Sequence, residues 1–197
     1  MKTTIPHLIK HNADNYSDEI AIREKKFGVW RTKTWNNCYE EIQNISLGLM
    51  EKGIKEKKTI AIIGNNTPRW TLSEIAIQSL GGVPLGLYSD ALESEIVYLL
   101  DYSDCRTLFV EDEEQADKIM SLPDSQSKID LIIYDEPKGM NKYKDKRLIA
   151  YKDLVEIGRK SKMINSELYH KMLEKINEDD TSIFCPTSGT TAHPKLA

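Results

Sequence analysis

The sequence predicts an α/β fold: a mostly parallel, doubly wound sheet with flanking helices, preceded by an N-terminal β-hairpin. The parallel sheet is predicted because, from Lys58 onward, short apolar runs alternate with segments whose apolar residues recur every three or four positions. The hairpin is predicted because two strand-like runs flank the turn-like stretch KKFG, which contains Gly28.

Residues 1–57 are expected to hold the hairpin and one helix. The hairpin strands are predicted at residues 19–24 and 29–35. Thr34 is the expected N-cap of a helix that ends at Gly53, because a Thr hydroxyl accepts from free N–H groups and glycine tolerates the left-handed angle at a helix end. The apolar face of this helix is made by Cys38, Ile42, Ile45 and Leu49.

Residues 58–135 are expected to form the βαβ units of the sheet. Strands are predicted at residues 59–63, 83–88, 107–110 and 129–135. Thr67 is the expected N-cap of the helix after the first of these strands. Asp90 and Glu93 are expected to form a capping box for the next helix, on whose apolar face Leu92 would lie.

Residues 136–197 are expected to hold a polar loop and two helices that lead to a last strand. One helix is predicted through residues 154–157 and the other through residues 168–176. The last strand, at residues 181–185, delivers the chain into PTSGTTAHPK. The segment richest in chemically useful side chains therefore follows directly after a strand.

Composition and patterning exclude several classes of protein. The net charge is −4 and the two signs are mixed along the chain, so general attraction to nucleic acid has little support. The N-terminus lacks a secretory signal, and the apolar runs are far shorter than the roughly 20 residues that cross a membrane. Cys38, Cys105 and Cys185 are widely spaced without a CxxC pair, which argues against a zinc site and a disulfide framework. A reduced, cytoplasmic protein is expected.

The segment at residues 187–192 is rich in hydroxyl groups and contains a glycine. Such a loop can turn backbone N–H groups and hydroxyls toward one anion, and Lys195 would add a positive charge nearby. The Walker pattern is absent. A phosphate-binding nest and an ordinary polar loop both fit this composition, so composition alone leaves the two open.

The spacing within this segment is more specific. TSGTTAHPK resembles the signature loop of the adenylate-forming superfamily, TSGTTGxPKG, whose members include acyl-CoA synthetases, luciferases and nonribosomal-peptide adenylation domains. The matching residues are Thr187, Ser188, Gly189, Thr190, Thr191, Pro194 and Lys195. The resemblance extends over nearly the whole chain, and the stretch IIYDEPKGMNKYKDKRLIAYKDLVEIGRK is similar to the long-chain acyl-CoA synthetase branch in particular.

The chain departs from the superfamily pattern at two positions. Ala192 stands where the pattern has a glycine, and it would strain the loop by roughly 1 kcal/mol if the loop needs a positive φ there. Leu196 replaces the glycine after the lysine, and the ending PKLA resembles a variant found in bacterial long-chain acyl-CoA synthetases.

The resemblance implies a reaction and its cofactors. Enzymes of this kind condense a fatty acid with ATP to an acyl-adenylate, release pyrophosphate, and pass the acyl group to coenzyme A, with Mg²⁺ bound to the nucleotide. By position, the residues that would hold the β- and γ-phosphates are Thr187, Ser188, Gly189, Thr190, Thr191 and Lys195. Thr187 is also a candidate ligand of Mg²⁺.

The resemblance also implies that the chain is a partial N-terminal domain, cut just past the phosphate loop. The adenine and ribose contacts, the metal-binding glutamate, the acyl tunnel and the catalytic lysine of the C-terminal domain would all follow Ala197. No catalytic residue is therefore expected in this piece, which should be inactive alone. An adenylating ligase for another carboxylic acid and a non-catalytic remnant that serves as an interaction module remain open. Strands left unpaired, including residues 181–185, would invite self-association, and peripheral membrane contact stays open.

Overall fold

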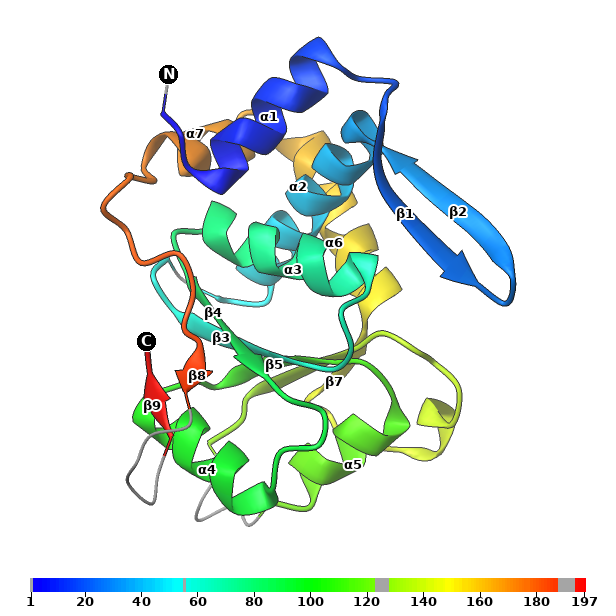
Figure 1. The fold of residues 1–197 in the computed structure, drawn as a ribbon, viewed down its shortest axis with the longest axis vertical. Helices are drawn as coiled ribbons and strands as arrows, with labels where there is room; N and C mark the ends of the chain where they lie inside the picture. The colour runs from blue at the N-terminus through cyan, green and yellow to red at the C-terminus, as the bar shows by residue number, and fades with distance from the viewer. Residues whose placement is uncertain (1, 55, 123–127, 188–193) are drawn as a thin grey trace. The chain divides into compact units, whose positions relative to one another are not determined.

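The computed structural model describes residues 2–54, 56–122, 128–187 and 194–197, which form two compact units built from interleaved segments (Figure 1). The helical unit comprises Met1–Glu56, Asn66–Gly81 and Leu154–Asp180. The sheet unit comprises Lys57–Asn65, Gly82–Asp153 and Thr181–Ala197. Each unit is described by itself below.

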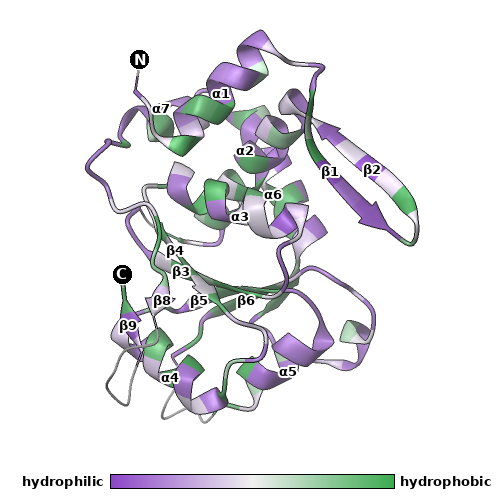
Figure 2. Cartoon of the chain, viewed as in Figure 1, coloured by the Kyte–Doolittle hydropathy of each residue, from purple (hydrophilic) through white to green (hydrophobic). Residues whose placement is uncertain are grey.

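The sheet unit is built on a five-stranded parallel sheet with the strand order β4-β3-β5-β6-β7. Its strands are β3 (Thr59–Ile63), β4 (Val83–Leu87), β5 (Thr107–Val110), β6 (Leu131–Tyr134) and β7 (Leu148–Ala150). The chain adds β4 on one side of β3 and the later strands on the other, so the predicted doubly wound parallel sheet is confirmed. The strands are strongly apolar in Figure 2, as expected for a sheet buried on both faces.

Helices α4 (Glu93–Tyr102) and α5 (Glu113–Met120) lie along one face of this sheet (Figure 1). Leu85 and Leu108 from the strands and Ile96 from α4 are fully buried in the shared core. The polar stretch that follows β6 contains a short 3-10 helix, η1 (Met140–Lys142), before β7. Strand β7 was not predicted, because its three residues are too few to show a period.

The helical unit packs five helices and the hairpin. Its elements are α1 (Ile5–Asn15), β1 (Ile20–Lys26), β2 (Val29–Thr34), α2 (Trp35–Glu51), α3 (Pro68–Ser79), most of α6 (Tyr151–Ile164) and α7 (Leu168–Glu174). Two glycines allow α2 and α6 to touch. A Cβ on Gly158 would lie 1.7 Å from the carbonyl oxygen of Asn44, and one on Gly48 would lie 2.3 Å from that of Leu154.

The caps at two predicted helix starts are confirmed. The Thr34 hydroxyl accepts a hydrogen bond from the backbone N–H of Asn37 at 3.2 Å, and the Asn37 side chain accepts from the N–H of Thr34 at 3.3 Å. The Thr67 hydroxyl accepts from the N–H of Trp70 at 3.2 Å. Both caps depend only on residues three apart in the sequence, which is why local patterning finds them.

The predicted capping box of Asp90 and Glu93 is wrong. Helix α4 begins at Glu93, its N-cap position is Leu92, and the Glu95 carboxylate accepts from the backbone N–H of Leu92 at 3.2 Å. Since Leu92 stands outside the helix, its side chain is 67% exposed rather than part of the apolar face.

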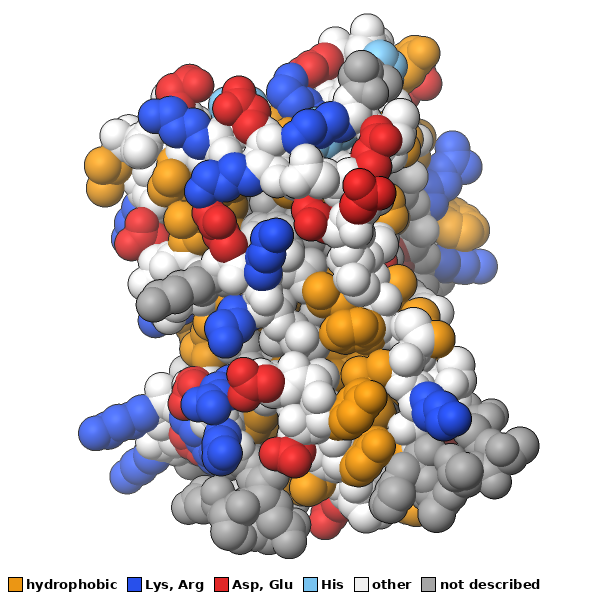
Figure 3. All heavy atoms as spheres, turned by 90° about the vertical axis from the view of Figure 1, so that its left-hand side faces the viewer, with side chains coloured by type: hydrophobic (Ala, Val, Ile, Leu, Met, Phe, Trp, Pro, Cys, Tyr) orange, Lys and Arg blue, Asp and Glu red, His pale blue; other side chains and the backbone are white. Residues whose placement is uncertain are grey.

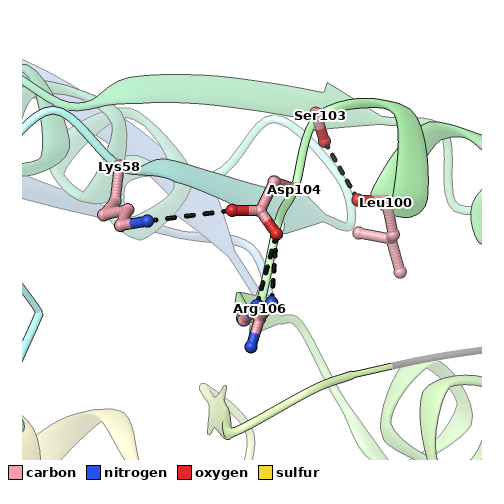
Figure 4. Close-up of polar contacts among 5 residues, drawn as sticks. All are labelled: Lys58, Leu100, Ser103, Asp104 and Arg106. Atoms are coloured by element: carbon pink, nitrogen blue, oxygen red, sulfur yellow. Dashed lines mark hydrogen bonds and ion pairs between the residues drawn. The ribbon is translucent and has the colours of Figure 1, made fainter.

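The turn between α4 and β5 holds Asp104 at a positive φ of 47°. Its carboxylate accepts from Arg106 at 3.3 Å and lies 3.7 Å from Lys58 Nζ, at the start of β3 (Figure 4). The Ser103 hydroxyl closes the end of α4 by donating to the carbonyl oxygens of Leu99 at 2.7 Å and Leu100 at 3.4 Å. The exposed ion pairs of Asp104 with Lys58 and Arg106 add little stability.

Candidate phosphate loop

The candidate loop is anchored to the edge of the sheet by one residue. Phe184 forms a parallel bridge with Leu85 of β4, and its N–H donates to the carbonyl oxygen of Pro84 at 2.9 Å. The predicted strand at residues 181–185 is therefore wrong, because only Phe184 pairs with the sheet. Since the bridge is parallel, the chain runs past it toward the carboxyl end of β4, the side on which open α/β sheets bind ligands.

Beyond the anchor, the chain forms the stem of a hairpin. Strand β8 (Pro186–Thr187) pairs antiparallel with β9 (Lys195–Leu196). Two further hydrogen bonds extend the stem: the N–H of Cys185 donates to the carbonyl oxygen of Ala197, and the N–H of Ala197 donates to that of Cys185, at 3.0 Å each. The loop residues named from the sequence, Ser188, Gly189, Thr190, Thr191 and Ala192, lie outside the described residues.

The stem brings together the two described members of the candidate site. Thr187 lies directly opposite Lys195, so both side chains project from the same face of the ribbon. The Thr187 hydroxyl donates to the backbone carbonyl oxygen of Lys195 at 3.2 Å. Both residues are exposed.

The opposite face of the stem is apolar. Leu196 and Phe184 are half-buried and pack against the core cluster that contains Leu85 and Ile96. The alternation along β9 therefore turns Lys195 outward and Leu196 inward. Leu196 consequently has a packing role in this chain at a position where the resemblance expects a glycine, and sequence reasoning missed that role.

A second polar contact lies at the end of β3. Gly64 has a φ of 149°, and a Cβ there would lie 2.7 Å from Cβ of Glu111. The Glu111 carboxylate accepts from the backbone N–H of Asn65 at 2.7 Å and from its side-chain amide at 3.0 Å. This carboxylate fixes the turn that leaves β3, so its role here is structural.

The described residues offer no metal cluster, and the two buried cysteines are not activated thiols. Among the described residues, no group of three or more His, Cys, Asp and Glu side chains could hold a metal ion. All the cysteines are free, and burial raises the thiol pKa of Cys38 to about 11 and that of Cys105 to about 12. These two cysteines are therefore protonated at neutral pH and unsuited to nucleophilic chemistry.

Acidic and basic side chains are interspersed on the face drawn in Figure 3, without a broad field of one sign. Within the described part of the chain, no helix is both long and apolar enough to cross a bilayer.

A search for related proteins decides the family. The model of the AMP-binding enzyme family matches residues 9–197, which include the whole stem and the loop sequence. The chain belongs to the AMP-binding enzyme family. Among curated relatives, this chain is similar to the long-chain-fatty-acid CoA ligase ACSBG2 of Homo sapiens, with 24% identity over 196 residues. The same protein of Mus musculus is 26% identical over 194 residues.

These matches cover 98% of this chain but only 28% of each relative. The chain therefore spans little more than a quarter of the length of the curated relatives it matches.

Solved structures confirm the fold. The luciferase-like enzyme of the mealworm Zophobas morio has a TM-score of 0.75 and 20% identity, over 97% of this chain and 41% of that one. The N-terminal domain of FACL13 from Mycobacterium tuberculosis has a TM-score of 0.73 and 19% identity, over 100% of this chain and 44% of that one. At these identities the likeness concerns the fold of an AMP-binding N-terminal domain.

Proposed function

We propose that this chain is part of the N-terminal domain of an AMP-forming long-chain fatty acid CoA ligase. In this proposal, the β- and γ-phosphates of ATP are held by Thr187, Ser188, Gly189, Thr190, Thr191 and Lys195. The observation that carries the proposal is the stem, which sets Thr187 opposite Lys195 at the two ends of the loop. The named relatives support the choice of a long-chain fatty acid as substrate.

The chemistry of the first step needs positive charge around the phosphates. A fatty acid carboxylate attacks the α-phosphorus, a new carboxyl O–P bond forms, and the bond between the α-phosphorus and the bridging oxygen breaks. The bonding electrons leave with pyrophosphate, which carries the excess negative charge. Lys195 would stabilise that charge as a fixed cation, and the loop N–H and hydroxyl groups would add preorganised donors.

The second step transfers the acyl group. The thiolate of coenzyme A attacks the acyl carbonyl carbon, a thioester forms, and AMP leaves with the electron pair of the broken C–O bond. ATP, coenzyme A and Mg²⁺ are thus the cofactors of the proposal. The residues that would serve this second step lie outside the chain in the proposal, so the chain alone should be inactive.

The hydrogen bond of Thr187 supports a specific role for its side chain. Its proton is directed at the carbonyl oxygen of Lys195, so the hydroxyl cannot donate that proton to a phosphate oxygen while the bond lasts. The oxygen keeps lone pairs free, and Mg²⁺ prefers oxygen ligands. Thr187 therefore stays in the proposed phosphate site and would in addition offer its oxygen as a ligand to the Mg²⁺ of the nucleotide, while Lys195 and the loop residues would donate to the phosphate oxygens.

The test is ATP-dependent acyl-CoA formation by the full-length protein across fatty acids of increasing chain length. A maximum at long chains is expected. Rapid turnover of a short, aromatic or amino acid substrate instead would favour another adenylating ligase. ATP–pyrophosphate exchange by the chain of 197 residues alone would contradict its expected inactivity.

The proposal extends to organisation and location. The division into a hairpin and helix segment at residues 1–57, βαβ units at 58–135 and the segment leading to the loop at 136–197 stays a prediction. So do a cytoplasmic location, peripheral membrane contact and self-association of the chain. A native stop codon directly after Ala197 would favour the alternative of a non-catalytic interaction module.

A further inference from the structure

The tip of the β1–β2 hairpin has a strained backbone. Phe27 and Gly28 form the turn between the paired residues Lys26 and Val29, with φ values of 51° and 80°. A turn with two positive φ angles favours Asn-Gly, because glycine has no Cβ and asparagine tolerates the left-handed region. Phenylalanine has neither advantage. The conformation of the turn therefore does not explain why phenylalanine stands at position 27.

Packing within the chain does not explain Phe27 either. Its side chain is 90% exposed, and its neighbours Val29 and Trp30 are 62% and 63% exposed. Three large apolar side chains thus lie within four consecutive residues at the end of a protruding two-stranded ribbon (Figure 1). A grouped set of exposed apolar side chains marks an interaction site more often than a scattered one.

The ribbon around this tip is mainly basic, and Glu24, opposite Arg31, is the one acidic residue between positions 23 and 33. Arg23, Lys25, Lys26 and Arg31 are exposed, and none of them takes part in an ion pair with another residue of the described ranges. Lys33, nearer the base of the ribbon, differs because it pairs with Glu41. The whole chain carries a net charge of −4, so the positive charge at the tip is local.

Trp30 combines both properties. It lies opposite Lys25, whose ammonium group is 6.0 Å from the centroid of the indole ring. Tryptophan beside a cation is typical of the boundary between lipid headgroups and acyl chains, where the ring is partly desolvated and its N–H stays hydrated.

We propose that the hairpin tip docks on a bilayer surface that carries anionic phospholipids. Phe27 and Val29 enter the interface, Trp30 lies at headgroup level, and the four unpaired basic side chains contact lipid phosphates. The inference goes beyond the proposed ligase function, because docking requires neither ATP nor a fatty acid. If the protein contacts a membrane peripherally, as the proposed function allows, the hairpin tip is the part that makes the contact.

Lipid fits the tip better than nucleic acid or a second copy of the chain. The tip protrudes, whereas single-stranded nucleic acid binds in a charged groove. A second copy would bring the same basic side chains against each other, which is unfavourable. An anionic bilayer complements both the charge and the apolar side chains.

The test is flotation of the purified full-length protein with vesicles of phosphatidylcholine alone or of an equimolar mixture with phosphatidylserine. Binding is expected for the anionic vesicles and should weaken in high salt. The variant F27N should bind about tenfold more weakly. Ile164 is 88% exposed at the end of α6, so I164N is a matched control that should bind like the wild type.

Folding of the variant is checked separately. Because asparagine tolerates the positive φ of the turn, F27N should have an equal or higher melting temperature while its vesicle binding falls. For charge, K25Q/K26Q should bind the anionic vesicles about tenfold more weakly, whereas K144Q/K146Q should not. Unchanged binding of F27N, equal binding to both kinds of vesicle, or binding of the wild type to an oligonucleotide but to neither vesicle would overturn the proposal.

Discussion

Thr187 donates its hydroxyl proton to the backbone carbonyl oxygen of Lys195 at 3.2 Å, across the pair of the β8–β9 stem that lies next to the loop. This contact ties together the two described residues of the candidate phosphate loop. It also fixes which groups remain available to a ligand, namely the lone pairs of the threonine oxygen and the ammonium group of Lys195.

The first prediction concerns the Thr187 hydroxyl. Valine keeps the β-branched shape and strand preference of threonine but removes the oxygen, so T187V in the full-length protein should keep the stem and lose the proposed Mg²⁺ ligand. We expect a fall in ATP-dependent acyl-CoA formation of about 10²-fold, measured over a range of Mg²⁺ concentrations. T187S retains the oxygen and should keep most of the activity. Equal activity of T187V and T187S would argue against a role for the hydroxyl.

The second prediction concerns Leu196, which packs against the sheet core. L196G restores the glycine of the superfamily pattern but removes this packing and makes the backbone more flexible in the unfolded state. The free energy of unfolding of the chain should fall by about 1–2 kcal/mol in a denaturant titration. L196M keeps the apolar volume and should cost less than about 1 kcal/mol. If the glycine variant were as stable as the wild type, the packing role would be wrong.

The third prediction concerns the contact between α2 and α6. In G158A the new methyl group would lie 1.7 Å from the Asn44 carbonyl oxygen, and backbone atoms cannot rotate away. The helices must separate, at a cost of about 3 kcal/mol in the free energy of unfolding. K152A changes an exposed position of the same helix and should stay within about 0.5 kcal/mol of the wild type. A stable G158A chain would contradict the close approach of these helices.

The fourth prediction concerns acid stability. The Arg147 guanidinium donates to Asp145 at 2.6 Å and holds the pKa of that carboxyl below its usual value. A carboxyl with a lowered folded pKa stabilises the chain above its unfolded pKa, and this stabilisation is lost as the pH falls through the folded pKa.

Comparison of D145N with the wild type tests this relation. At neutral pH the variant should be less stable by about 1 kcal/mol, since the pair is partly exposed, and the difference should shrink below about pH 4. D130N, at an exposed carboxyl, serves as the control and should show no such convergence. A difference that stays constant from neutral to acid pH would exclude the ion pair as its cause.

The sequence predicted the features that depend on neighbours along the chain. The caps at Thr34 and Thr67 and the buried strands β3 and β5 follow from residue type and spacing within a few positions. The doubly wound parallel sheet followed as well, because alternating strands and helices leave few ways to wind, whereas its strand order and strand β7 were not predicted.

Features decided by tertiary contacts could not be predicted in the same way. Leu92 fits an apolar helical face by spacing, yet the helix starts two residues later than predicted, where the Glu95 carboxylate accepts from the N–H of Leu92, and Leu92 is exposed. Phe184 is the single paired residue of an expected strand, since β4 accepts only one bridge there. The inward position of Leu196 depends on the register of the stem, which the loop sequence does not specify.

The most direct test of the account is ATP–pyrophosphate exchange, driven by a long-chain fatty acid, in the full-length protein carrying K195M. Methionine keeps the length of the side chain and removes its charge, while K146M removes an exposed lysine elsewhere in the same unit as a control. We predict that K195M lowers kcat/KM for ATP by about 10²–10³-fold and that K146M leaves it unchanged. An exchange rate in K195M equal to that of the wild type would contradict the assignment of this loop to the phosphates of ATP.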